Sequence, residues 1–71
     1  MSTLDAALLD AHARQDRQAL VRLYTQAADA ASNQAAARFY LTHAYIFALE
    51  IGAPDADPLR ARLVAMGAEV E

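Results

Sequence analysis

The chain has 71 residues, a net charge of −3 and no cysteine. This length allows one domain, and the lack of cysteine excludes a disulfide framework and a thiolate metal site. Charged residues recur throughout, which excludes a membrane-spanning segment, and the six basic residues, all arginines, form no stripe for nucleic acid.

These properties predict a small cytoplasmic protein with neither a nucleic-acid nor a membrane partner. The first five residues carry no basic side chain, so no secretory signal is expected. A chain this short buries barely enough apolar surface to offset its conformational entropy. It therefore needs very close helix packing, a protein partner or self-association.

Strong helix formers dominate the chain, and glycine and proline occur only in its last third, which predicts an all-α fold. The first helix is expected at about residues 3–14. Ser2 would cap it, and its buried stripe would consist of Leu4, Leu8 and Ala11.

The second helix is expected at about residues 17–31. Asp16 precedes it and suits the N-cap, because a carboxylate there accepts a free backbone N–H and complements the helix dipole. Its apolar stripe consists of Leu20, Leu23, Tyr24, Ala27 and Ala31.

The third helix, at about residues 34–51, follows a break and cap at Ser32 and Asn33. Its apolar residues form two stripes. One consists of Ala36, Phe39, Tyr40, His43, Ala44, Phe47 and Ile51, and the other of Ala37, Leu41, Ala44, Tyr45, Ala48 and Leu49. Because only a narrow polar line remains, this helix is expected to be buried nearly all round.

The fourth helix is expected to be short, at residues 58–66. Gly52 and Pro54 end the third helix, and Asp57 with Pro58 reads as an N-cap followed by a proline in the first turn. Its stripe consists of Leu59, Leu63 and Met66, and Gly67 closes it. The whole chain, residues 1–71, is thus predicted to be one domain, a small antiparallel bundle of three main helices plus a short fourth, with the third helix central.

Two runs in the middle of the chain carry a resemblance to a known repeat type. They are Ala-Leu-Val-Arg-Leu-Tyr at 19–24 and Ala-Ala-Arg-Phe-Tyr at 36–40. The segment 17–52 resembles the helical hairpins of tetratricopeptide and Sel1-like repeats, with Phe39 where the Sel1-like pattern has tryptophan. It departs from the pattern in lacking glycine in the inter-helix turn and in its longer third helix. The resemblance implies a hairpin scaffold that binds a peptide or another helical protein.

The two histidines, His12 and His43, lie on apolar faces, and neither has a glutamate three or four residues away. Packing at a helix crossing explains both, while ligand or metal binding is the alternative. Ser2 and Ser32 are explained as caps, and the chain has no lysine. We therefore expect no enzymatic activity, catalytic residue, metal site or cofactor.

The aromatic residues cluster in the third helix. Phe39 and Phe47 share one stripe and are expected in the core. Tyr40 and Tyr45 point in different directions, so at least one of them is expected at the rim, where its ring is available to a partner.

The predicted function is that of a non-enzymatic protein-interaction module, an adaptor or accessory subunit, or a homodimer joined through the central helix. The short stripes of the other helices are expected to cover two sides of that helix but not all of it, so the protein-binding surface is expected at Tyr40, Tyr45, Ala48 and Leu49. The alternative is a small ligand-, metal- or cofactor-carrying bundle that uses His43 and the neighbouring aromatic residues.

Overall fold

The computed structural model describes residues 3–68, and within them the chain forms four α-helices and no strand. The helices are α1 (Thr3–Ala13), α2 (Arg17–Ala30), α3 (Gln34–Glu50) and α4 (Ala56–Ala65). The predicted all-α fold is confirmed. The expected contrast between three main helices and a short fourth is not, because α4 has 10 residues and α1 has 11.

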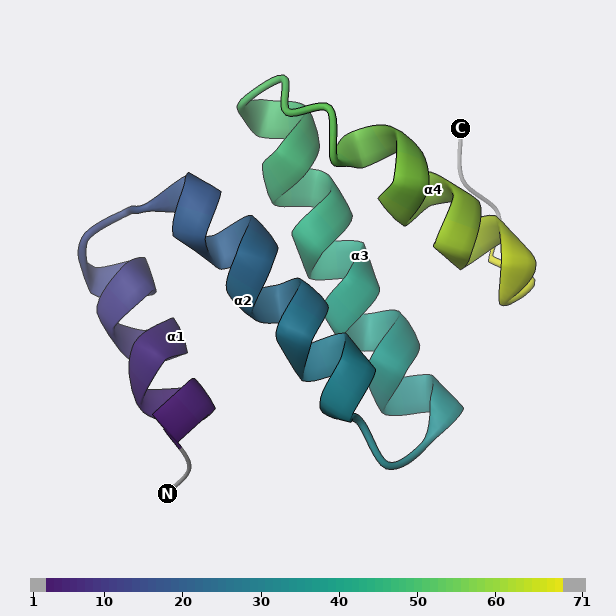
Figure 1. The fold of residues 1–71 in the computed structure, drawn as a ribbon, viewed down its shortest axis with the longest axis horizontal. Helices are drawn as coiled ribbons and strands as arrows, with labels where there is room; N and C mark the ends of the chain where they lie inside the picture. Colours follow the sequence, from purple (N-terminus) through teal and green to yellow (C-terminus); the bar gives the residue numbers. More distant parts are fainter. Residues whose placement is uncertain (1–2, 69–71) are drawn as a thin grey trace.

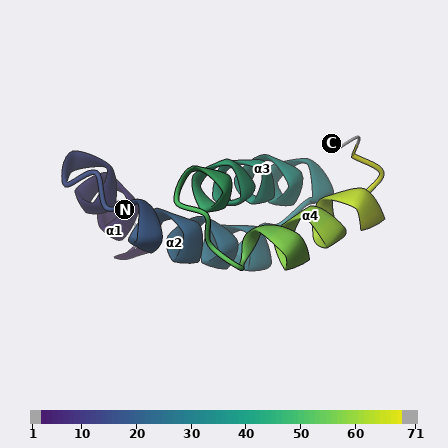
Figure 2. The ribbon, with the colours of Figure 1, turned by 90° about the horizontal axis from the view of Figure 1, so that it is seen from above.

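Each helix packs against its neighbours along the chain, and α3 lies between α2 and α4 (Figure 1). Seen from above, α3 lies on one side of α2 and α4, while α1 lies at the outer edge of α2 (Figure 2). The molecule is flat, with extents of 30 × 29 × 13 Å. No helix of the described residues covers the side of α3 that faces away from α2 and α4.

Two predicted N-caps are present. An oxygen of the Asp16 carboxylate accepts the N–H of Ala19 at 3.1 Å, and the side-chain oxygen of Asn33 accepts the N–H of Ala36 at 2.8 Å. The predicted Ser2 cap lies outside the described residues. Each observed cap satisfies an N–H group that has no partner within its helix, and so fixes where α2 and α3 begin.

The predicted start of the fourth helix is wrong. The helix begins at Ala56, with Asp55 rather than Asp57 in the N-cap position, and no side chain caps it. Pro58 therefore lies within the first turn and not at its first position. A proline is tolerated there because the N–H groups of the first turn have no helical acceptor.

Three helices end in the same backbone turn, in which the residue after the C-cap has a positive φ. Gly52 follows α3 with φ 64°, and Gly67 follows α4 with φ 83°. After α1 the same place is taken by Gln15, with φ 53°. In this turn the N–H of the following residue donates a hydrogen bond to a carbonyl oxygen of the last helical turn. After α1, the N–H of Asp16 donates to the carbonyl oxygen of Ala11 at 2.9 Å. The predicted helix ends at Gly52 and Gly67 are confirmed.

Most of the buried side chains form two clusters. The larger one, between α2, α3 and α4, contains Val21, Ala28, Leu41, Ala44, Tyr45, Ala48, Leu59 and Leu63. The smaller one, between α1 and α2, contains Ala11, Ala19, Leu20 and Leu23. Because α2 contributes to both, it holds the two halves of the molecule together.

The expectation that α3 is buried nearly all round is wrong. Leu41 and Ala48 are 1% and 0% exposed, whereas Phe39, Ile46 and Leu49 are 57%, 49% and 53% exposed. The reason is that both neighbours of α3 lie on the same side of it. The expected core position of Phe39 is therefore also wrong, while Phe47 is half-buried and packs against both clusters.

Candidate interaction surface

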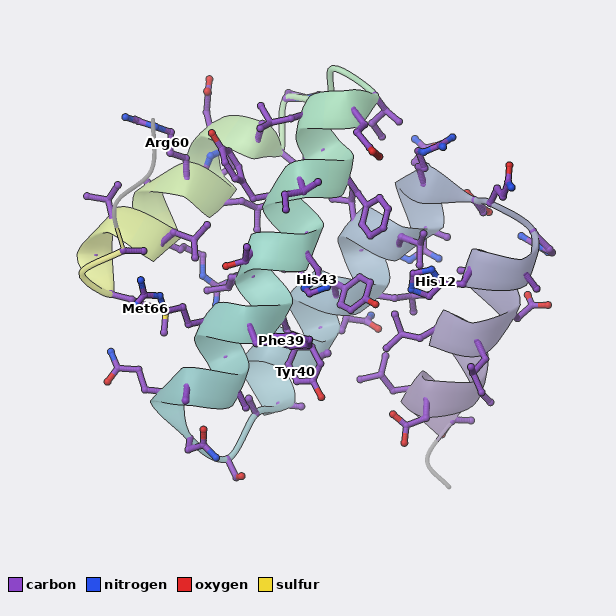
Figure 3. The ribbon with its side chains drawn as sticks, turned by 180° about the vertical axis from the view of Figure 1, so that it is seen from behind. His12, Phe39, Tyr40, His43, Arg60 and Met66 are labelled. Atoms are coloured by element: carbon purple, nitrogen blue, oxygen red, sulfur yellow. The ribbon has the colours of Figure 1, made fainter. Side chains whose placement is uncertain are left out.

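Aromatic and imidazole rings from α1, α2 and α3 touch one another in a continuous set, which we name the ring cluster. Its members are His12, Tyr24, Phe39, Tyr40, His43 and Phe47. Figure 3 shows His12 on α1 and His43 on α3, with Phe39 and Tyr40 about one turn earlier on α3. Residues far apart in sequence thus build one surface.

Tyr24 of α2 is the centre of the ring cluster. Its ring stacks on the rings of His43 and Phe47, with centroids 5.1 and 5.9 Å apart, and lies 6.2 Å from the ring of Tyr40. Burial, together with the nearby Tyr40, raises the pKa of the Tyr24 phenol. A tyrosine with the ordinary pKa of 10.0 is already protonated at neutral pH, and the shift keeps the proton on Tyr24 to a still higher pH.

His12 connects α1 to the rest of the ring cluster. Its Nε2 lies 2.8 Å from the hydroxyl oxygen of Tyr24 in a hydrogen bond, and its ring meets Phe47 edge-on at 6.0 Å. This arrangement agrees with the interpretation of His12 as a histidine whose polar edge is satisfied at a helix crossing. The side chain remains exposed, so a bound molecule could still reach it.

His43 is fixed by its own helix. Its Nδ1 lies 2.9 Å from the carbonyl oxygen of Phe39, one turn earlier, and its ring centroid is 4.4 Å from that of Phe39. A carbonyl only accepts, so Nδ1 carries a proton and donates it to this bond. In the neutral imidazole, Nε2 is then the nitrogen left to accept a hydrogen bond.

A pocket of about 180 Å³ lies beside the ring cluster where α1, α2 and α3 meet. It is lined by His12, Gln15, Arg17, Leu20 and Phe47. It thus combines two rings and an aliphatic side chain with polar groups, the composition that small recognition pockets generally have.

A larger cavity of about 560 Å³ lies elsewhere, between α2 and the turn that joins α3 to α4. Its lining consists of Gln18, Val21, Arg22 and residues 51–55. No aromatic or imidazole ring lines it. We place the candidate site at the smaller pocket because the ring cluster borders it.

The structure separates the four residues that the sequence placed on a binding surface. Tyr40 is half-buried in the ring cluster, and Leu49 is exposed. The expected exposure of Tyr45 and Ala48 is wrong, since they are 9% and 0% exposed. Both lie on the side of α3 that packs into the larger core cluster. At least one tyrosine was expected at the rim of the core, and Tyr40 is the one that lies there.

Sequence reasoning missed two features of this surface. Tyr24 was assigned to a core stripe, although it is the centre of the ring cluster. Phe39 was expected in the core, and Ile46 was assigned to neither apolar stripe. Their spacing of seven residues, with Leu49 three further on, was the signal that could have placed them on one side of the helix.

Two further findings concern metal sites and membranes. In the part of the chain that the structure describes, no three side chains of histidine, cysteine, aspartate or glutamate are grouped to hold a metal ion. Among the same residues, no helix has both the length and the apolar character that crossing a membrane requires.

No protein-family model, no curated protein and no solved structure matches the chain. The resemblance of segment 17–52 to tetratricopeptide and Sel1-like repeats therefore stays a prediction.

Proposed function

We propose that the protein is a non-enzymatic interaction module, an adaptor or accessory subunit, that binds a segment of a partner protein at the ring cluster and the pocket beside it. The observation that carries the proposal is the continuity of the rings across three helices. Rigid rings bury a large area for a small loss of side-chain entropy, which is why they are common at binding hot spots.

The contacts around the pocket support an apolar partner side chain anchored by polar groups. Phe47 and Leu20 offer apolar surface, while His12 and Arg17 offer nitrogen groups at its edge. Arg17 also pairs with Glu50 of α3 at 3.3 Å, and both side chains are about half exposed. Such an exposed ion pair contributes little to stability, so a partner carboxylate can compete for the guanidinium.

The experiment is site-specific photo-crosslinking in the cell that makes the protein. A photoreactive amino acid replaces Arg17 beside the pocket, and in a control chain it replaces Val64, which is exposed on α4. We expect a discrete adduct from position 17 that is absent from position 64. Combining the label at 17 with His12→Ala should reduce the yield, because this variant removes one side of the pocket.

Two results would contradict the proposal. One is the same set of adducts from positions 17 and 64, which would indicate random collisions. The other is a discrete adduct from position 17 that the His12→Ala variant leaves unchanged. Circular dichroism of each purified variant establishes that it is folded as the parent chain is.

The second candidate function is that of a small-ligand, metal or cofactor carrier. It is favoured by one observation, namely that the rings of both histidines contact the ring of Tyr24. Thermal melts of the parent chain and of His43→Leu, with and without Zn²⁺ or Ni²⁺, test the metal form of this function. A metal carrier predicts that metal raises the melting temperature of the parent chain but not that of His43→Leu. If metal leaves the melting temperature of the parent chain unchanged, this function is ruled out.

A further inference from the structure

The uncovered side of α3 carries five positions at alternating intervals of four and three residues. They are Ala35, Phe39, Thr42, Ile46 and Leu49, and we name them the outer seam. At 3.6 residues per turn they fall within an arc of about 80°. None of them is charged, and none belongs to a buried core cluster. This spacing is the one by which a helix packs lengthwise against a second helix.

We infer that the outer seam pairs with the outer seam of a second copy of the chain, with the two α3 helices antiparallel. In this register Phe39 of each copy packs against Leu49 of the other, and Ile46 packs against Thr42. Large and small side chains then alternate along the contact. Each α3 becomes covered on the one side that its own chain leaves open.

The charges on α3 favour the antiparallel direction. Arg38 lies next to the seam in the first half of the helix, whereas Glu50, in the last turn, lies on the other side of the seam. Antiparallel pairing places Arg38 of one copy level with the negative, carboxyl-terminal end of the other α3. Parallel pairing would instead place the Arg38 side chains of the two copies level with each other. Glu50 forms an ion pair with Arg17 of its own chain.

The area of the seam favours a second copy over a lone peptide. At the exposed fractions given above, Phe39, Ile46 and Leu49 leave on the order of 300 Å² of apolar surface, the size of a functional patch on a monomer. A second copy contributes an equal and already folded patch, so no chain has to be ordered on binding. With the surrounding polar atoms, the contact falls in the range of weak interfaces below about 1,200 Å². We therefore expect a reversible dimer.

This inference does not depend on the proposed function. The outer seam shares no residue with the pocket, and only Phe39 with the ring cluster. The experiment is sedimentation velocity of the full chain from micromolar to millimolar concentration. We expect the mean sedimentation coefficient to rise with concentration from the monomer toward the dimer value.

Ile46→Glu is the test variant, and Val64→Glu is its matched control, because both parent side chains are 49% exposed. Ile46→Glu should raise the dissociation constant about tenfold or more, because pairing would desolvate a carboxylate in each copy. Val64→Glu should leave it unchanged. A thermal melt at low concentration verifies that both variants fold.

Cysteine cross-linking tests the direction, since the parent chain contains no cysteine. Two chains, Phe39→Cys and Leu49→Cys, are mixed and oxidised. Antiparallel pairing predicts mainly the mixed disulfide, whereas parallel pairing predicts the two symmetric ones.

Three outcomes would overturn the inference. They are a chain that stays monomeric to millimolar concentration, a dimer that Ile46→Glu and Val64→Glu affect equally, and predominantly symmetric disulfides. None of these results bears on the crosslinks from position 17, so the two proposals can fail separately.

Discussion

The inner and outer faces of α3 have similar apolar compositions and opposite surroundings. On the inner face, Leu41, Ala44 and Ala48 pack against α2 and α4 and are almost completely buried. On the outer face, Phe39, Ile46 and Leu49 keep about half of their surface in contact with solvent. An apolar helix therefore has surface to bury on every side, but the arrangement of its neighbours decides which side is covered.

The largest expected effect comes from removing volume on the inner face of α3. Leu41→Ala should lower the free energy of unfolding by about 2–5 kcal/mol. Leu41 is only 1% exposed, so its truncation leaves a cavity in the core. Leu49→Ala should cost less than about 1 kcal/mol, since its site is open to water. Urea denaturation at low protein concentration measures both, and equal losses would show that the two faces do not differ.

Adding volume should give the second-largest effect. Ala48→Leu is expected to cost about 1–3 kcal/mol, because the side chain is 0% exposed and its neighbours would have to shift. Ala35→Leu, on the exposed side of the same helix, should change the free energy of unfolding by no more than about 0.5 kcal/mol. Thermal melts of the two variants provide the test, and an Ala48→Leu protein as stable as the parent would contradict this packing.

The comparison extends to the turns that end the helices, where Gln15 takes the conformation that glycine takes after α3 and α4. Gln15→Gly should raise the melting temperature by about 2–4 °C, because relief of the left-handed strain outweighs the greater freedom of the unfolded chain. Gln26→Gly, in the middle of α2, is the control and should lower stability by about 0.5–1 kcal/mol. A destabilised Gln15→Gly protein would show that the glutamine side chain matters more than its φ.

The smallest expected effect concerns acid. The hydrogen bond from the N–H of Ala19, and then that from Arg14, lowers the pKa of Asp16 below its ordinary value of 3.8. The folded chain thus binds this proton less readily than the unfolded chain. Its contribution to stability is present above pH 3.8 and is lost as the pH falls from there through the lowered pKa.

Asp16→Asn retains a capping oxygen and removes this titration. The difference in stability between the parent chain and Asp16→Asn should therefore shrink as the pH is lowered from 5 to about 2. Denaturant titrations at a series of pH values measure it. A difference that is constant over this range would mean that the ionised cap has no influence.

Local signals in the sequence were sufficient for most helix boundaries. The oxygen of Asp16 and that of Asn33 cap the helices that they were predicted to cap, and Gly52 ends α3 as its conformational freedom suggests. The start of α4 was misplaced because proline is compatible with any position of a first turn. These features depend on a few adjacent residues, which is why a pattern can reveal them.

The binding surface could be predicted only in part. Tyr40 and Leu49 lie on accessible parts of α3, but Tyr45 and Ala48 do not. The rotation of a helix in its surroundings is normally read from the contrast between an apolar and a polar face. In α3 that contrast is almost absent, so its sequence contains little information about which side faces inward.

Residue patterns were sufficient to predict an all-helical fold, the caps of two helices, and one helix with more apolar surface than its neighbours can cover. The packing of the folded chain, in contrast, places α2 and α4 on the same side of α3. It also brought His12, Tyr24 and His43 together from three helices. Caps and turns depend on bonds between adjacent residues, whereas the choice of the covered side depends on the packing of all four helices at once.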